Sequence, residues 1–122
     1  MQYGYKLDMG RIGCVLEIFK LDGAADELYT WKSTFNSKGI ETSRVKSDGV
    51  EVALCQFDTL LYPDNIEEDE LLFIDVLSGA PVAEDHDVMR LCSLLVAKWA
   101  AGHTEESFHD TIRDTLKKWS EG

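Results

Sequence analysis

"RVKSDGVEVALCQF" (residues 44–57) carries the clearest folding signal in the chain. Asp48-Gly49 separates two strand-like runs, and an Asp-Gly pair suits a tight type I′ hairpin turn because both central positions of that turn need positive φ. We therefore expect two antiparallel strands, near residues 40–47 and 50–57.

A second hairpin is indicated at the N-terminus. Apolar residues recur at every second position from Tyr3 to Met9, which is the period of a half-buried strand. The glycine-flanked turn "GRIG" (10–13) then leads into "CVLEIFKL" (14–21), a second run of strand-like composition. The first 21 residues are therefore predicted to form two paired strands.

Between the two predicted hairpins, the spacing favours a helix over residues 22–39. Ala25, Leu28, Trp31 and Phe35 recur at helical intervals. Acidic residues stand at the start of this segment and Lys38-Gly39 closes it, as is typical of helix ends. We expect an amphipathic helix of about fifteen residues.

The C-terminal half is expected to contain one strand and two helices. "LLFIDVL" (71–77) is a near-continuous apolar run, typical of a strand covered on both faces. Apolar residues at helical spacing follow from Glu84 to Gly102 and again after Thr104, a good N-cap. The predicted order is ββαβββαα. It describes one α+β domain over residues 1–122, with helices packed on a five-stranded, mainly antiparallel sheet.

The charge distribution limits the classes of partner. The net charge is -11, and the thirty residues 58–87 hold ten acids with no lysine or arginine. This imbalance argues against direct nucleic-acid binding, which needs clustered cations, and equally against an anionic membrane surface. The partners that such a charge favours are cationic, a basic protein or a divalent metal, and the remaining alternative is that the charge serves only solubility.

The densest acidic stretch is "DNIEEDE" (64–70), and two interpretations of it stay open. It either binds a basic protein partner or forms a solvated connection whose charges prevent strand-to-strand aggregation. Chain geometry predicts that the helix after Glu84 returns to this end of the sheet, while "EDHD" (84–87) lies at the other end. The predicted partner-binding residues are Asp64, Glu67, Glu68, Asp69, Glu70, Glu105 and Glu106.

Other candidate sites are weaker. Asp75 interrupts an apolar strand, so it either pairs with a structural donor or lines a pocket between sheet and helices. In "EDHDVMR" (84–90), His86 could act as a general base, but acids that stabilise the first turn of a helix explain the cluster more simply. His103 and His109 are expected to be surface or capping residues.

The sequence shows no catalytic motif, and we expect no metal and no cofactor. Cys14, Cys55 and Cys92 have spacings that suit neither disulfides nor zinc, and all three are predicted to be buried and reduced. With no signal-peptide pattern, cytoplasmic residence is the default expectation. Trp119, near the chain end, is a candidate anchor for a homodimer. The leading hypothesis is a non-enzymatic interaction module of the inhibitor, immunity or adaptor type. The alternative is a small-molecule binder or enzyme with a pocket around Asp75.

Overall fold

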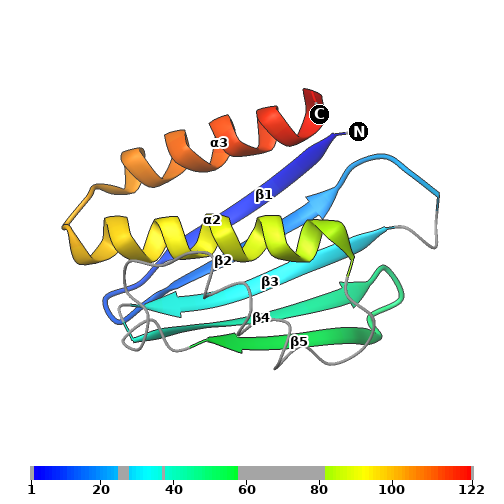
Figure 1. Cartoon of the computed structure of the whole chain (residues 1–122), viewed down its shortest axis with the longest axis horizontal. Helices are drawn as coiled ribbons and strands as arrows, with labels where there is room; N and C mark the ends of the chain where they lie inside the picture. Colours follow the sequence, from blue (N-terminus) through cyan, green and yellow to red (C-terminus); the bar gives the residue numbers. More distant parts are fainter. Residues whose placement is uncertain (1, 25–27, 37, 58–81, 122) are drawn as a thin grey trace.

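The computed structural model describes residues 2–24, 28–36, 38–57 and 82–121, with the backbone alone for residues 53–57. Its elements are β1 (Tyr3–Met9), β2 (Cys14–Lys20), β3 (Tyr29–Asn36), β4 (Gly39–Lys46), β5 (Glu51–Phe57), α2 (Ala83–Ala100) and α3 (Glu105–Glu121). The strands lie in the sheet in sequence order, and each neighbouring pair is antiparallel. Both helices cover the same face of the sheet (Figure 1). The predicted α+β class with a five-stranded antiparallel sheet is confirmed.

The predicted helix over residues 22–39 is wrong, because residues 29–36 form strand β3. Trp31, Ser33 and Phe35 alternate with exposed residues and are all buried toward the helices. Ser33 is polar, so the inward-facing positions do not read as an unbroken apolar alternation. Its hydroxyl lies 2.8 Å from that of Thr42 on β4, which satisfies both buried groups. The predicted strand 71–77 lies outside the described residues.

The β4–β5 hairpin forms as predicted, but its turn is not of type I′. Within this turn only Gly49 has a positive φ (87°). Asp48 does not, because every residue with positive φ in the described part of the chain is a glycine. The Gly49 N–H donates to the Lys46 carbonyl at 2.8 Å, and the Asp48 side chain accepts from the Val50 N–H at 2.9 Å. Asp48 therefore stabilises the turn through its carboxylate and not through a left-handed backbone.

The two C-terminal helices are confirmed. The buried residues of α2 are Asp85, Val88, Met89, Leu91, Cys92, Leu95 and Val96. The helix ends at Ala100 and is capped by Ala101, and Gly102 follows with a φ of 76°, the left-handed conformation that is common just after a helix. The Thr104 hydroxyl then accepts from the Ser107 N–H at 3.3 Å and caps α3, as the sequence indicates.

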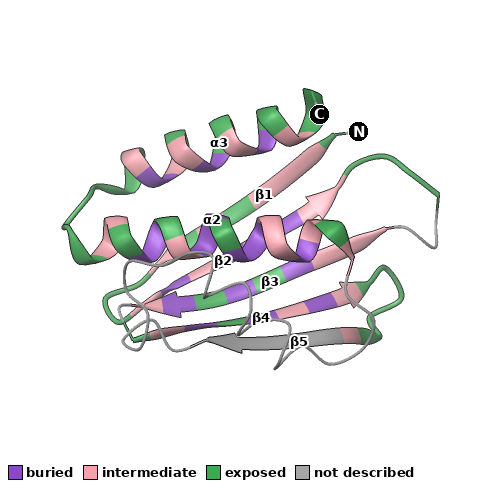
Figure 2. Cartoon of the chain, in the orientation of Figure 1, coloured by how far each residue is buried: buried purple, intermediate pink, exposed green. Residues whose placement is uncertain are grey.

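The hydrophobic core lies between the sheet and the two helices, with buried residues on the facing sides of both layers (Figure 2). The face of the sheet away from the helices carries cross-strand charge pairs. Glu17 on β2 stands directly opposite Lys6 of β1 and Lys32 of β3. Opposite charges at facing positions of neighbouring strands favour this register. Edge strand β1 packs against α3 above it (Figure 1), and the contact between these two elements forms the candidate site.

Candidate functional site

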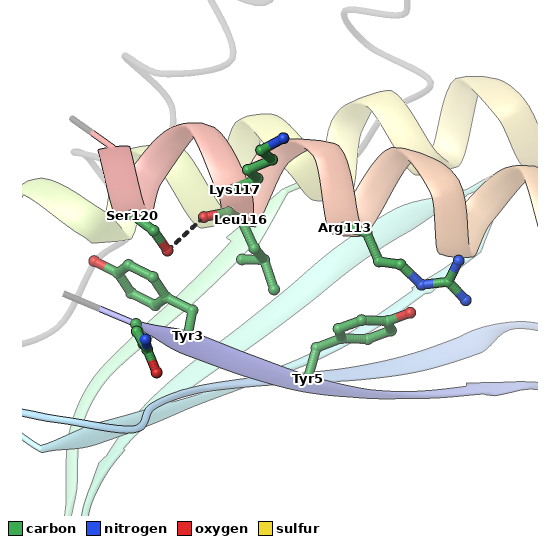
Figure 3. Close-up of a pocket in the computed structure, with 7 residues that line it drawn as sticks. Tyr3, Tyr5, Arg113, Leu116, Lys117 and Ser120 are labelled. Atoms are coloured by element: carbon green, nitrogen blue, oxygen red, sulfur yellow. Dashed lines mark hydrogen bonds between the residues drawn. The ribbon is translucent and has the colours of Figure 1, made fainter.

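A groove of about 380 Å³ runs between β1 and α3 (Figure 3). Its lining residues are Gln2, Tyr3, Tyr5, Arg113, Leu116, Lys117 and Ser120. The volume falls within the range of sites that hold small molecules, roughly 300 to 1,000 Å³. The groove therefore offers room for a ligand at the junction of the two layers.

Apart from Gln2, the lining residues lie on one face of strand β1 and one face of helix α3. Tyr3 and Tyr5 are two positions apart on β1, so both point to the face that α3 covers (Figure 3). On α3, the lining residues follow the spacing i, i+3, i+4 and i+7 of a single helix face; they are Arg113, Leu116, Lys117 and Ser120. Leu116 is buried and belongs to the hydrophobic core.

Tyr3 is held by aromatic packing and partial burial. Its ring meets the Trp119 ring edge-on, with 5.5 Å between centroids and 77° between planes. Burial raises the pKa of Tyr3, and the negative charge of Glu84 raises it further, while Lys20 lowers it in part. The Tyr3 phenol is therefore neutral at physiological pH and keeps its hydroxyl hydrogen.

Tyr5 contacts His109 of α3, and through it Glu105. Its hydroxyl lies 2.8 Å from Nδ1 of His109. Nε2 of His109 in turn lies 3.5 Å from Oε1 of Glu105, one helical turn earlier. These contacts connect a lining residue of the groove to a titratable imidazole and then to an exposed carboxylate.

The residues that line the groove include bases but no acid, although the protein is strongly acidic. None of its seven lining residues is an acid, and two are bases, in a chain of net charge -11. Arg113 lies 3.5 Å from Asp110, but both side chains are more than half exposed, so this pair contributes little. Lys117 forms no ion pair within the described part of the chain. An anion is the ligand that this lining favours.

A second polar cluster lies at the start of α2 and has a structural role. Asp85 is 7% exposed, and its Oδ1 accepts from Trp31 Nε1 at 2.7 Å. Its Oδ2 accepts from the Val82 N–H at 2.8 Å and from the buried guanidinium of Arg44. Because both carboxylate oxygens are occupied by protein donors, Asp85 fixes α2 to the sheet and does not present a binding site.

Lys20 and Glu84 form a neighbouring ion pair, with 2.9 Å between Nζ and Oε1. The Lys20 ammonium also lies 5.9 Å from the centre of the Trp31 ring, within cation–π distance. Burial raises the pKa of Glu84, but the hydrogen bond from Lys20, a backbone hydrogen bond and the charges of Lys20 and Arg44 together outweigh it, so the pKa is lowered overall. Glu84 is therefore ionised and paired at neutral pH.

The predicted acidic site is described only in part. Asp64, Glu67, Glu68, Asp69, Glu70 and Asp75 lie outside the described residues. Glu105 and Glu106 are exposed in the first turn of α3, at the opposite end of the helical layer from residues 84–87 (Figure 1). Lys98 in the last turn of α2 lies at the same end, so the described part of this end carries bases as well as acids.

The other sequence-based candidates have structural explanations. Residues Glu84 and Asp85 occupy the first turn of α2, and Asp87 pairs with Arg90 at 3.8 Å, as the simpler interpretation of "EDHDVMR" requires. His103 is exposed and contacts Ser107 at 3.0 Å. His109 is different, because its contact with Tyr5 places it next to the groove.

Two of the cysteines behave as predicted. Cys14 and Cys92 are free and buried. Burial raises the pKa of Cys14 to about 11 and that of Cys92 to about 12, and neither thiol is a nucleophile at neutral pH. The side chain of Cys55 lies outside the described residues.

No protein-family model, curated protein or solved structure matches this chain. The described residues contain no group of three or more potential metal ligands. None of the helices in the described ranges is long and apolar enough to cross a membrane. The functional argument therefore rests on the geometry of the groove.

Proposed function

We propose that this protein is a non-enzymatic binding protein that holds a small anionic molecule in the groove between β1 and α3. One observation carries the proposal: two bases and several hydroxyl groups line the groove and no acid does, in a chain of net charge -11.

The lining suits an anion attached to an apolar body. Arg113 offers planar paired donors that match a carboxylate, sulfonate or phosphate, and Lys117 adds a mobile point charge. The Tyr3 and Tyr5 rings, with Leu116, provide apolar surface for the remainder of the ligand. Since Arg113 is exposed, solvent screens its charge. We expect modest affinity for a simple probe, with a Kd of roughly 0.1 to 1 mM, or about 4 to 5.5 kcal/mol.

The test is an NMR titration of ¹⁵N-labelled protein with benzenesulfonate, which combines a fixed negative charge with an aromatic body. We expect saturable shifts at amides of β1 and the second half of α3. The double variant Arg113→Gln/Lys117→Gln should weaken binding about tenfold or more, because it removes both cations from the groove.

Lys118→Gln is the matched control, since Lys118 is an exposed base on the same helix but does not line the groove. It lowers the total positive charge without changing the lining, and it should bind like the wild type. Shifts that do not saturate, or an equal loss in the control and the double variant, would contradict the proposal.

A second candidate function is the recognition of a basic protein through the acidic end. The observation in its favour is the group of five acids within residues 64–70, together with the exposed side chains of Glu105 and Glu106. The residues proposed for this surface are Asp64, Glu67, Glu68, Asp69, Glu70, Glu105 and Glu106. A Glu105→Gln/Glu106→Gln variant should bind polylysine more weakly than the wild type at low salt, and the difference should vanish at high salt. A pocket around Asp75 stays a prediction.

A further inference from the structure

The hydrogen bond between Tyr5 and His109 joins the proposed anion site to a titratable group. Tyr5 lines the groove, and its hydroxyl lies 2.8 Å from Nδ1 of His109. In Figure 3 the Tyr5 hydroxyl and the Arg113 guanidinium are turned toward the same end of the groove. A change in the hydrogen-bonding role of Tyr5 would therefore act where the anion is expected to lie.

The charge state of His109 determines that role. A neutral imidazole has one N–H, and the proximity of Glu105 to Nε2 favours placing it there. Nδ1 is then an acceptor, so the Tyr5 hydroxyl donates its hydrogen to His109 and turns lone pairs toward the groove. A protonated imidazole donates from both nitrogens, so Tyr5 becomes the acceptor and its hydrogen is released toward the groove.

We infer that the groove binds its anion together with a proton on His109, which makes the affinity for the anion rise as pH falls. This inference rests on the proposed function. An anion needs donors, and protonation converts Tyr5 from a repelling acceptor into a donor while adding a positive charge nearby.

The groups around His109 are consistent with this direction. Tyr5 faces it from β1, and Glu105 and Arg113 lie one turn before and one turn after it on α3. Glu105 accepts from the protonated ring. Arg113 opposes the charge of the ring, and Asp110, which follows His109 and lies 3.5 Å from Arg113, offsets part of that opposition. From α2, the contact with this part of α3 is apolar, between the rings of Trp99 and Phe108.

The experiment measures the Kd of benzenesulfonate between about pH 5.5 and pH 8. A sulfonate keeps its charge over this range, whereas a phosphate monoester changes charge near pH 6 and would confuse the result. We expect the wild type to bind about three- to tenfold more tightly at the acidic end. By reciprocity, saturating benzenesulfonate should move the NMR titration midpoint of His109 to higher pH.

Variants separate His109 from other titrating groups. His109→Gln should bind the probe with an affinity that does not change over this range. Tyr5→Phe should keep only the smaller part of the pH dependence, which comes from the charge of the imidazolium. His103→Gln is the control, because His103 is an exposed histidine that contacts Ser107 and does not line the groove. It should behave like the wild type.

The outcomes distinguish the inference from the proposal beneath it. An absence of saturable binding at every pH overturns both. Saturable binding that is independent of pH overturns the inference and leaves the proposed function in place. The same holds if His109→Gln keeps the pH dependence or if His103→Gln removes it.

Discussion

Replacing Asp85 by asparagine tests how the helical layer is attached to the sheet. The side chain of Asp85 accepts from Trp31 and from the Val82 N–H, and it pairs with Arg44. Asparagine has nearly the same shape and can still accept one of these hydrogen bonds, but it carries no charge. Asp85→Asn therefore removes the negative charge that Asp85 presents to the guanidinium of Arg44, which is 4% exposed.

The expected cost is large relative to the stability of the protein. Removing one member of a buried ion pair costs about 3 to 5 kcal/mol, because the remaining charge is left desolvated. A domain of this size has a free energy of unfolding of about 5 to 15 kcal/mol. With a denaturant slope of about 1 to 3 kcal/mol per molar urea, the unfolding midpoint should fall by roughly 1 to 5 M.

The assay is urea unfolding near pH 7, followed by tryptophan fluorescence and circular dichroism. Asp87→Asn is the matched control, since Asp87 lies in the same turn but forms a half-exposed pair with Arg90 at 3.8 Å. Its loss should change stability by no more than about 0.5 kcal/mol. If Asp85→Asn also cost less than about 1 kcal/mol, the ion pair with Arg44 would not be what fixes α2 to the sheet.

Three further predictions concern Glu84, Cys92 and Gly13. The pKa of Glu84 is lowered overall in the folded protein. The stability that ionised Glu84 contributes is therefore present above the pKa of an unfolded glutamate and is lost as pH falls through the lowered value. Glu84→Gln should therefore be less stable than the wild type near pH 7, and this difference in urea unfolding should shrink below about pH 4.3. In a variant whose only cysteine is Cys92, iodoacetamide near pH 8 should alkylate the unfolded protein but not the native one, since burial raises the pKa of this thiol to about 12. Gly13→Ala should destabilise the fold by about 1 to 3 kcal/mol, because the added Cβ would lie 2.9 Å from the carbonyl oxygen of Phe35. Thermal unfolding measures this loss, and an unchanged melting temperature would show that the backbone of β3 can shift away from the new methyl group without cost.

The elements that the sequence predicts correctly are those with strong local signals. The two C-terminal helices combine helical apolar spacing with end signals at Gly102 and Thr104, and the β4–β5 hairpin has its Asp-Gly pair. In these segments the periodic pattern and the chain-reversing residues agree. Backbone geometry alone was then sufficient to place Glu105 at the opposite end of the helices from residues 84–87.

The errors arise where a side chain depends on a distant partner. Ser33 occupies an inward-facing position of β3 because Thr42 accepts or donates across the sheet, and this polar residue hid the two-residue period. Trp31 and Phe35 then fitted a helical spacing by coincidence. A β-propensity argument from the threonine and aromatic content of residues 29–35 would have favoured a strand. Arg44 looks like a surface residue until Asp85, 41 positions later, is brought to it.

The groove between β1 and α3 also depends on residues that are distant in the sequence, and sequence patterns alone do not predict it. The sequence contains both of its halves as local patterns: tyrosines two apart on β1, and two bases flanking Leu116 on α3. A period assigns residues to a face, but it does not say which two faces meet. The hydrogen bond between Tyr5 and His109 spans 104 positions of the chain. The acidic composition of the chain predicts a site at the acidic stretch. The proposed site depends instead on two cations, Arg113 and Lys117, which the packing of α3 on β1 places in the groove. In a strongly charged protein, a binding site is better sought where the tertiary structure gathers the minority charge than where the sequence accumulates the majority one.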